Sequence, residues 1–103
     1  DDEMFGGGNL MEHMAWWFIH NVIAHPILGV LPCRASVKLH DYTSDRLNRK
    51  TKPSSSPLPV IKDRRAWLVH NCVSHVRIGL NPSKQTFAEH DRTAEVMRVP
   101  GWV

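Results

Sequence analysis

The sequence has few of the features that usually indicate an activity in a small protein. Its 103 residues include only two cysteines, Cys33 and Cys72, and no Cys-x-x-Cys motif. No Gly-rich phosphate loop and no recognisable nucleophile accompany its histidines and aspartates. Net charge is a mild +3, which does not by itself argue for nucleic acid. These absences weaken most enzyme classes and leave architecture as the main source of inference.

No apolar run is long enough to cross a bilayer uninterrupted, since a spanning helix needs about 20 mostly apolar residues. The most apolar segment, residues 14–31, is interrupted by His20 and Asn21. The chain opens with acidic residues, so we expect no signal peptide. Trp16 and Trp17 suit a headgroup boundary, which keeps peripheral membrane docking through this segment as an alternative, although we do not expect a membrane surface to be the partner.

The most informative feature of the sequence is a repeat with an offset of 50 residues. Segment 17–43 aligns with segment 67–93 without a gap, and nine of 27 positions are identical. The identical pairs are Trp17/Trp67, His20/His70, Asn21/Asn71, His25/His75, Gly29/Gly79, Pro32/Pro82, His40/His90, Asp41/Asp91 and Thr43/Thr93. We interpret the repeat as an internal duplication. A unit of about 30 to 35 residues is too short to bury its own core, so we expect both copies to share one.

The repeat predicts an all-α fold of two tandem helical hairpins, packed with pseudo-twofold symmetry around one core. The expected helices cover residues 10–24, about 33–48, 64–76, and the segment from Pro82 to just before Pro100. The alternative is a small α+β fold, with short strands at 36–39 or 59–62. The predicted organisation is a flexible leader (1–9), a first hairpin (10–48), a linker (49–59) and a second hairpin (60–103).

Local signals set the expected boundaries. Asn9 and Asp63 are the expected N-caps of the first helix in each copy. Pro26 is expected to end or kink the first helix at His25, because proline lacks a backbone donor. Three prolines and three serines make residues 49–59 an extended linker.

Six of the seven histidines occupy repeated positions, and an aspartate and an asparagine repeat with them. Imidazole and carboxylate groups suit zinc, iron or manganese, which makes a divalent metal one hypothesis. The expected ligands are His25, His40, Asp41, His75, His90 and Asp91; the other repeated polar positions are His20, Asn21, His70 and Asn71. Residues five apart in a regular helix point about 140° from each other, so His20 and His25 are not expected to share an ion unless Pro26 distorts the turn.

Two other readings of these polar residues stay open. They can form a buried hydrogen-bonded network with no ligand at all, because buried polar groups must be paired. A His-Asp pair can also act as a general base, although no catalytic residue is assigned from the sequence.

The cysteines and the basic residues indicate less about function than the histidines do. Cys33 and Cys72 occupy non-equivalent repeat positions, so we expect free thiols in a reducing compartment. Seven of the 13 lysines and arginines lie within residues 46–65. The candidate phosphate contacts are Arg49, Lys50, Lys52, Arg64 and Arg65. Aromatic residues are not interleaved with them, so nucleic acid is only weakly supported as a partner.

The first copy of the repeated motif resembles a group of known sequences. The string His20–Pro26, followed by Gly29, Leu31-Pro32 and the run from Leu39 to Thr43, resembles small uncharacterised proteins encoded by bacteriophages. The resemblance covers residues 16–47 best. It implies only an origin and a setting: a phage accessory protein in the cytoplasm of a bacterial host, with a host or phage macromolecule as partner.

We therefore expect a small, non-enzymatic binding module, with a divalent metal such as zinc at the repeated histidines and aspartates as one hypothesis for its ligand. The first alternative is a small metal-dependent phosphohydrolase that uses the His-Asp pairs. The second is the peripheral membrane protein described above. A homo-oligomer is left open.

Overall fold

A computed structural model of the chain describes residues 7–102, and residues 1–6 and 103 lie outside it. The segments, in order, are α1 (Gly7–Phe18), the π-helix η1 (Ile19–Ala24), α2 (His25–Val30), α3 (Arg34–Asn48), α4 (Arg64–Leu68), the π-helix η2 (Val69–Ser74), α5 (His75–Leu80) and α6 (Lys84–Met97). Residues 7–102 contain no strand, so the all-α prediction is confirmed and the α+β alternative is wrong.

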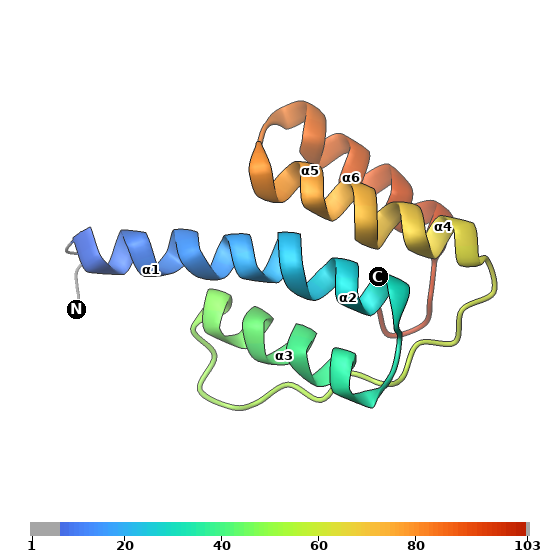
Figure 1. Cartoon of the computed structure of the whole chain (residues 1–103), viewed down its shortest axis with the longest axis horizontal. Helices are drawn as coiled ribbons and strands as arrows, with labels where there is room; N and C mark the ends of the chain where they lie inside the picture. Colours follow the sequence, from blue (N-terminus) through green and yellow to red (C-terminus); the bar gives the residue numbers. More distant parts are fainter. Residues whose placement is uncertain (1–6, 103) are drawn as a thin grey trace.

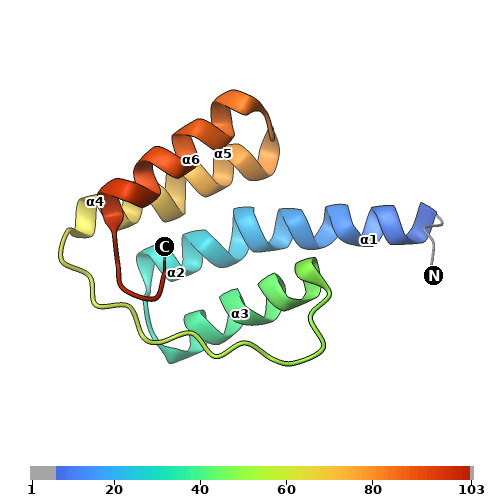
Figure 2. The same cartoon turned by 180° about the vertical axis from the view of Figure 1, so that it is seen from behind.

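The helices form two similar pairs. Segments α1, η1 and α2 join into one long helix and α4, η2 and α5 into another; these two run in opposite directions (Figure 1). α3 packs beside the first long helix and α6 beside the second, as the reverse view also shows (Figure 2). The hydrophobic core draws on both pairs, as expected: Leu28, Val37, Ala66, Trp67, Met97 and Val99.

Matching elements recur with the offset of 50. Both π-helices, the short helices that follow them, and the starts of α3 and α6 obey it. Trp67 is buried in the core and its indole N–H donates to the Leu28 carbonyl at 3.3 Å. Trp17 is half-buried and packs against Phe87, with 6.0 Å between ring centroids. The two halves therefore differ in detail, and their origin by duplication stays an interpretation.

Two glycines let the long helices approach closely. A Cβ atom on Gly29 would lie 2.7 Å from Cys72 Sγ and 2.9 Å from Asn71 Cβ. A Cβ atom on Gly79 would lie 2.7 Å from Val22 Cγ2 and 2.8 Å from Asn21 Cβ. An asparagine Cβ is fixed to its own helix backbone and cannot move aside. Any larger residue at either glycine would therefore push the helices apart.

Two expected boundaries of the first helix were wrong. The helix already begins at Gly7, so Asn9 lies inside its first turns and does not precede it. Residues 7–9 of the predicted leader are thus helical. Pro26 does not end the helix, which continues to Val30. The π-helix just before Pro26 shifts the backbone pairing there: the His25 N–H donates to the His20 carbonyl, five residues back. Proline lies at the start of the next α-helical segment, where its missing donor is tolerated.

The boundaries of the other helices agree better with those expected from the sequence. The Asp63 side chain accepts from the Ala66 N–H at 3.1 Å and caps α4, as predicted. α3 and α6 begin at Arg34 and Lys84, and the last helix ends before Pro100. The second long helix extends to Leu80, beyond the expected residue 76, because the predicted connector is helical.

The linker lies along α3. The Ser54 N–H donates to Asp45 Oδ2 at 2.7 Å, and the Ser56 N–H donates to Asp41 Oδ2 at 2.7 Å. Two carboxylates of α3 thus fix the path of a segment that has no regular structure. The same carboxylates also accept from the Ser54 and Ser56 hydroxyls, so the backbone and the side chain of each serine are both paired.

Within residues 7–102, no helix has the length and apolar character that crossing a membrane requires. Residues 14–31 include the exposed apolar side chains of Met14, Phe18, Ile23 and Ile27. Peripheral docking through this segment stays a prediction.

The close approach at Gly29 gives a stability prediction. In an ordinary helix, Gly→Ala stabilises by roughly 1 kcal/mol. Here we expect Gly29→Ala to destabilise by about 1–3 kcal/mol, because the methyl group overpacks the contact with Asn71. The free energy of unfolding is measured by chemical denaturation, with circular dichroism as the readout. Val30→Ala, at the exposed next position, should change stability by less than about 0.5 kcal/mol. A Gly29→Ala protein as stable as the parent would contradict the observed packing.

Candidate metal centres

The six repeated histidines form two clusters. His20, His25 and His40 make the first triad; His70, His75 and His90 make the second. In each triad the candidate ligand atoms all lie within 4.8 Å of one another. Each triad takes two residues from a long helix and one from the helix packed beside it, α3 or α6. Two triads of this kind could hold metal ions.

The π-helices bring the histidines of each long helix together. Hydrogen bonds between residues i and i+5 place residues five apart near one another on one face. His20 Nε2 lies 3.2 Å from His25 Nε2, and His70 Nε2 lies 3.2 Å from His75 Nε2. The expectation that His20 points away from His25 was therefore wrong. Pro26 is not the cause, because the second copy has the same π-helix and carries Val76 at that position.

The two triads meet at a stacked pair of rings. His25 and His75 lie face to face, with 3.4 Å between centroids and 5° between planes. His40 completes the first triad, with its ring 4.6 Å from that of His25. In the second triad, His90 Nε2 lies 3.1 Å from His75 Nε2.

A threonine fixes the protonated nitrogen of one ring in each triad. His20 Nδ1 lies 3.0 Å from Thr43 Oγ1, and His70 Nδ1 lies 3.0 Å from Thr93 Oγ1. Each threonine hydroxyl also lies 3.0 Å from the backbone carbonyls three and four residues earlier, and Thr93 Oγ1 lies 2.8 Å from Ser74 Oγ. A hydroxyl has one proton, so a threonine that donates to a carbonyl accepts from imidazole, and Nδ1 then carries the ring proton.

An asparagine from the opposite half fixes a second ring. His25 Nδ1 lies 2.6 Å from Asn71 Oδ1, and His75 Nδ1 lies 2.7 Å from Asn21 Oδ1. Each asparagine NH₂ group donates to the carbonyl four residues earlier, which leaves the amide oxygen facing the ring. An amide oxygen only accepts, so both imidazoles carry their proton on Nδ1.

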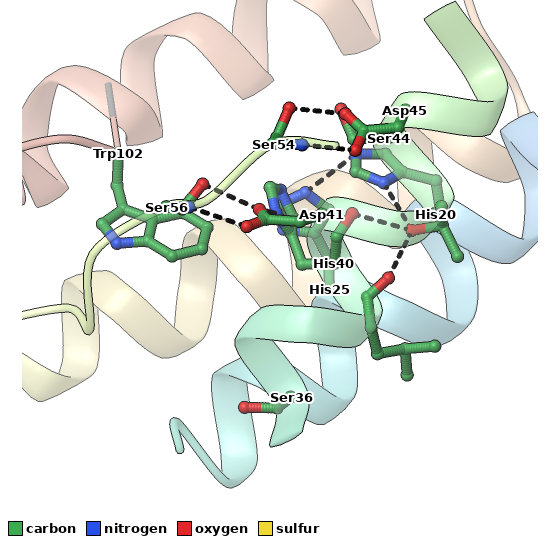
Figure 3. A network of polar contacts seen from close by, with 12 residues as sticks. His20, His25, Ser36, His40, Asp41, Ser44, Asp45, Ser54, Ser56 and Trp102 are labelled. Carbon is green, nitrogen blue, oxygen red and sulfur yellow. Dashed lines mark hydrogen bonds and ion pairs between the residues drawn. The ribbon is translucent and has the colours of Figure 1, made fainter. Parts of the chain in front are cut away.

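An aspartate fixes the third ring. His40 Nδ1 donates to Asp41 Oδ1 at 3.0 Å, and His90 Nδ1 donates to Asp91 Oδ1 at 3.1 Å. In the first triad Asp41 also accepts from the N–H and hydroxyl of Ser56 (Figure 3). Burial acts to raise the pKa of the Asp41 carboxyl, but the hydrogen bonds from Ser56 and His40 outweigh it and keep that pKa below its usual value.

All six rings thus carry a proton on Nδ1 and direct the lone pair of Nε2 into their triad. Two lone pairs about 3 Å apart repel each other unless a proton or a metal cation lies between them. Burial and neighbouring histidines lower the pKa of His25 and His75 well below 6.5. Burial, with His40 or His90, lowers the pKa of His20 and His70 to about 4. At neutral pH a proton therefore does not bridge His20 and His25, or His70 and His75.

The spacing fits a metal ion. Zinc binds imidazole nitrogen at about 2.0–2.1 Å, so two ligands of a tetrahedral site lie about 3.3 Å apart. The separations of 3.1 and 3.2 Å between Nε2 atoms are close to this value. Hydrogen bonds from the second ring nitrogen to an oxygen atom are the usual support of a metal-binding histidine.

Both triads face one pocket. A cavity of about 790 Å³ is lined by all six histidines, by four further residues of α6 and its end, and by Ser56, Gly101 and Trp102. Three nitrogen ligands would leave one position of a tetrahedral ion free, and both sets of ligands line the cavity. A purely structural zinc site normally has four protein ligands, whereas each triad offers three.

The remaining residues singled out from the sequence lie elsewhere. Asp41 and Asp91, predicted as ligands, contact Nδ1 of their neighbouring histidines behind the triads. Arg49, Lys50 and Lys52 follow α3, whereas Arg64 and Arg65 begin α4 at the opposite end of the linker (Figure 1). The five basic residues are exposed and do not form one patch. Cys33 and Cys72 are free thiols, as predicted.

The roles of Thr43, Thr93 and Trp102 were missed from the sequence. Thr43 and Thr93 are an identical pair of the repeat, which was a usable signal, because they lie three residues after His40 and His90. Trp102 lies outside the aligned segments. Its ring packs against His40, 4.7 Å between centroids, and nothing in the sequence pattern indicates this contact.

The buried histidines predict an acid-sensitive metal-free protein. A histidine in an unfolded chain has a pKa of 6.5, whereas that of folded His20 or His70 is about 4. Between these values the unfolded chain binds protons that the folded chain does not. The free energy of unfolding should be constant above about pH 6.5 and should fall towards pH 4, by about 1.4 kcal/mol per pH unit for each fully protonated group.

Urea denaturation in the presence of a chelator, repeated between pH 8 and pH 4, measures this profile. A free energy of unfolding that stays level from pH 7 to pH 5 would show that these histidines are not held neutral by the fold.

The chain was also compared with known proteins. No protein-family model, no curated protein and no solved structure matches it. The geometry of the two triads is therefore the basis for any functional conclusion.

Proposed function

We propose that the chain is a metal-binding module that holds two divalent transition-metal ions, one in each histidine triad. Zinc is the first candidate. The observation that carries the proposal is the common orientation of all six imidazoles, with Nδ1 hydrogen-bonded outward and Nε2 directed inward. A network built only from hydrogen bonds would alternate donors and acceptors, whereas here acceptor faces acceptor in both triads.

The composition of the ligand set supports zinc over magnesium or calcium. Imidazole suits zinc, copper, iron and nickel, whereas magnesium and calcium prefer oxygen ligands. The free cysteines lie outside both triads, so no thiolate selects copper(I) or an iron–sulfur cluster. Asp41 and Asp91 would act on the metal through His40 and His90, by orienting the ring and increasing the basicity of Nε2.

Elemental analysis after zinc loading and dialysis tests the proposal. We expect two zinc equivalents per chain, because there are two complete triads. His20→Ala should lower the content to one equivalent. His13→Ala is the matched control, since His13 is exposed and is the one histidine outside the triads, and it should retain two. Asp41→Asn should keep the first ion with an affinity about 10- to 100-fold weaker.

Two results would contradict the proposal. One is a parent protein that retains no zinc, iron, copper or nickel after loading. The other is a His13→Ala variant that loses metal as readily as His20→Ala, because binding would then not depend on the triads.

Hydrolysis of phosphate esters is a second candidate function. It is favoured by the free coordination position that each triad leaves towards the shared cavity, since catalytic zinc sites keep such a position for water or substrate. The zinc-loaded protein would then hydrolyse bis(4-nitrophenyl) phosphate, and both the metal-free protein and His75→Ala would not. A metal-loaded protein without turnover would leave the binding module as the function.

A further inference from the structure

The two triads differ in how they are covered. In the first triad the carboxylate behind His40 is held by Ser56, and the side chain of Asp41 is 9% exposed. In the second triad the side chain of Asp91 is 78% exposed, and of the described residues only His90 bonds to it. The side chain of His90 is also more exposed than that of His40, at 26% against 15%.

Trp102 lies beside Ser56 and packs against His40 of the first triad (Figure 3). Its ring lies 4.7 Å from that of His40, and its indole N–H donates to the Pro57 carbonyl at 2.8 Å. Gly101 makes the turn that returns the chain to the site. It has φ of +83°, and a Cβ atom there would lie 2.7 Å from Pro57 Cγ. A hydrogen bond thus connects Pro57 of the linker to Trp102, next to the His40 ring.

The second triad opens towards α6 and the cavity. Ala94, Glu95 and Arg98 line the cavity on this side, one and two turns beyond His90. The Arg98 side chain is 72% exposed, and its only ion pair among the described residues is a long one of 3.6 Å to Glu95. Its guanidinium group is therefore free to contact a ligand in the cavity.

The charge of the ligand follows from the chemistry of the triads. Three neutral imidazoles leave the two positive charges of each bound ion uncompensated in the first shell. Such an ion becomes the largest local charge and attracts an anion to its free position. A guanidinium group matches the oxygen atoms of a phosphate group with two parallel hydrogen bonds.

We propose that the centre at His70, His75 and His90 is the ligand-accepting one, and that its ligand is a phosphate group, either inorganic phosphate or the phosphate of an ester. The centre at His20, His25 and His40 also faces the cavity, but Ser56 and Trp102 line the cavity beside it and leave it less accessible. The proposal rests on the proposed metal binding and adds to it a ligand class and a division of roles between the centres.

Cobalt-loaded protein tests the proposal, because the visible absorption of cobalt(II) changes with its ligands. Metal content is measured first, so that a failure to bind metal is distinguished from a failure to bind phosphate. Addition of inorganic phosphate should change about half of the cobalt absorption in the parent protein, and then saturate. Phenyl phosphate in a parallel titration shows whether free phosphate or an ester binds more tightly; saturable binding of either supports the proposal.

Paired variants assign the response to one centre. His40→Ala should lose the first ion and keep the phosphate response, whereas His90→Ala should lose the second ion and the response with it. His40→Gln and His90→Gln replace them if either alanine variant unfolds. Arg98→Ala should weaken phosphate binding about tenfold. Adding Trp102→Ala to His90→Ala should restore a response by opening the first centre.

Three results would overturn the proposal. The first is a cobalt-loaded parent protein that responds to neither probe. The second is a change in all of the cobalt absorption, since both centres would then be open. The third is a response of His90→Ala equal to that of His40→Ala.

Discussion

The hydrogen bond that His25 donates to Asn71, with its reciprocal from His75 to Asn21, is the contact on which the rest of the structure depends. It joins the two halves at their centre, so each triad depends on the opposite half for the asparagine that orients one of its rings. It requires the long helices to lie close together, which only glycine at positions 29 and 79 allows. It also sets the tautomer of the two stacked rings, and so directs their Nε2 atoms into the triads.

This contact makes the centre of the molecule unusually polar for so small a fold. Buried polar groups stabilise a protein only when they are paired, and unpaired ones cost free energy. The six Nδ1 atoms are paired with threonine, asparagine or aspartate, whereas the six Nε2 atoms converge as acceptors without donors. The metal-free fold therefore carries a local repulsion that a bound cation would relieve, and the apolar core around Trp67 has to compensate for it.

Much of the fold followed from the repeat, because hydrophobic spacing and N-caps act locally. Asp63 capped α4, and the two hairpins shared a core as expected. The geometry of the candidate site was harder to predict from the sequence. The π-helices that bring His20 to His25 depend on a backbone shift that residue spacing does not encode, so the geometry of a regular helix placed these rings apart. Trp102 reaches His40 through a turn at Gly101 whose position depends on the linker, and such long-range contacts leave no local pattern.

Nitrogen-15 NMR of the histidine side chains tests the central claim most directly, because it identifies which ring nitrogen carries the proton. The account predicts that at neutral pH all six triad histidines are protonated on Nδ1, and that addition of zinc shifts their Nε2 signals while His13 stays unchanged. A proton on Nε2 of His25 or His75 would contradict it, since the lone pair would then point at an asparagine and not into a metal site.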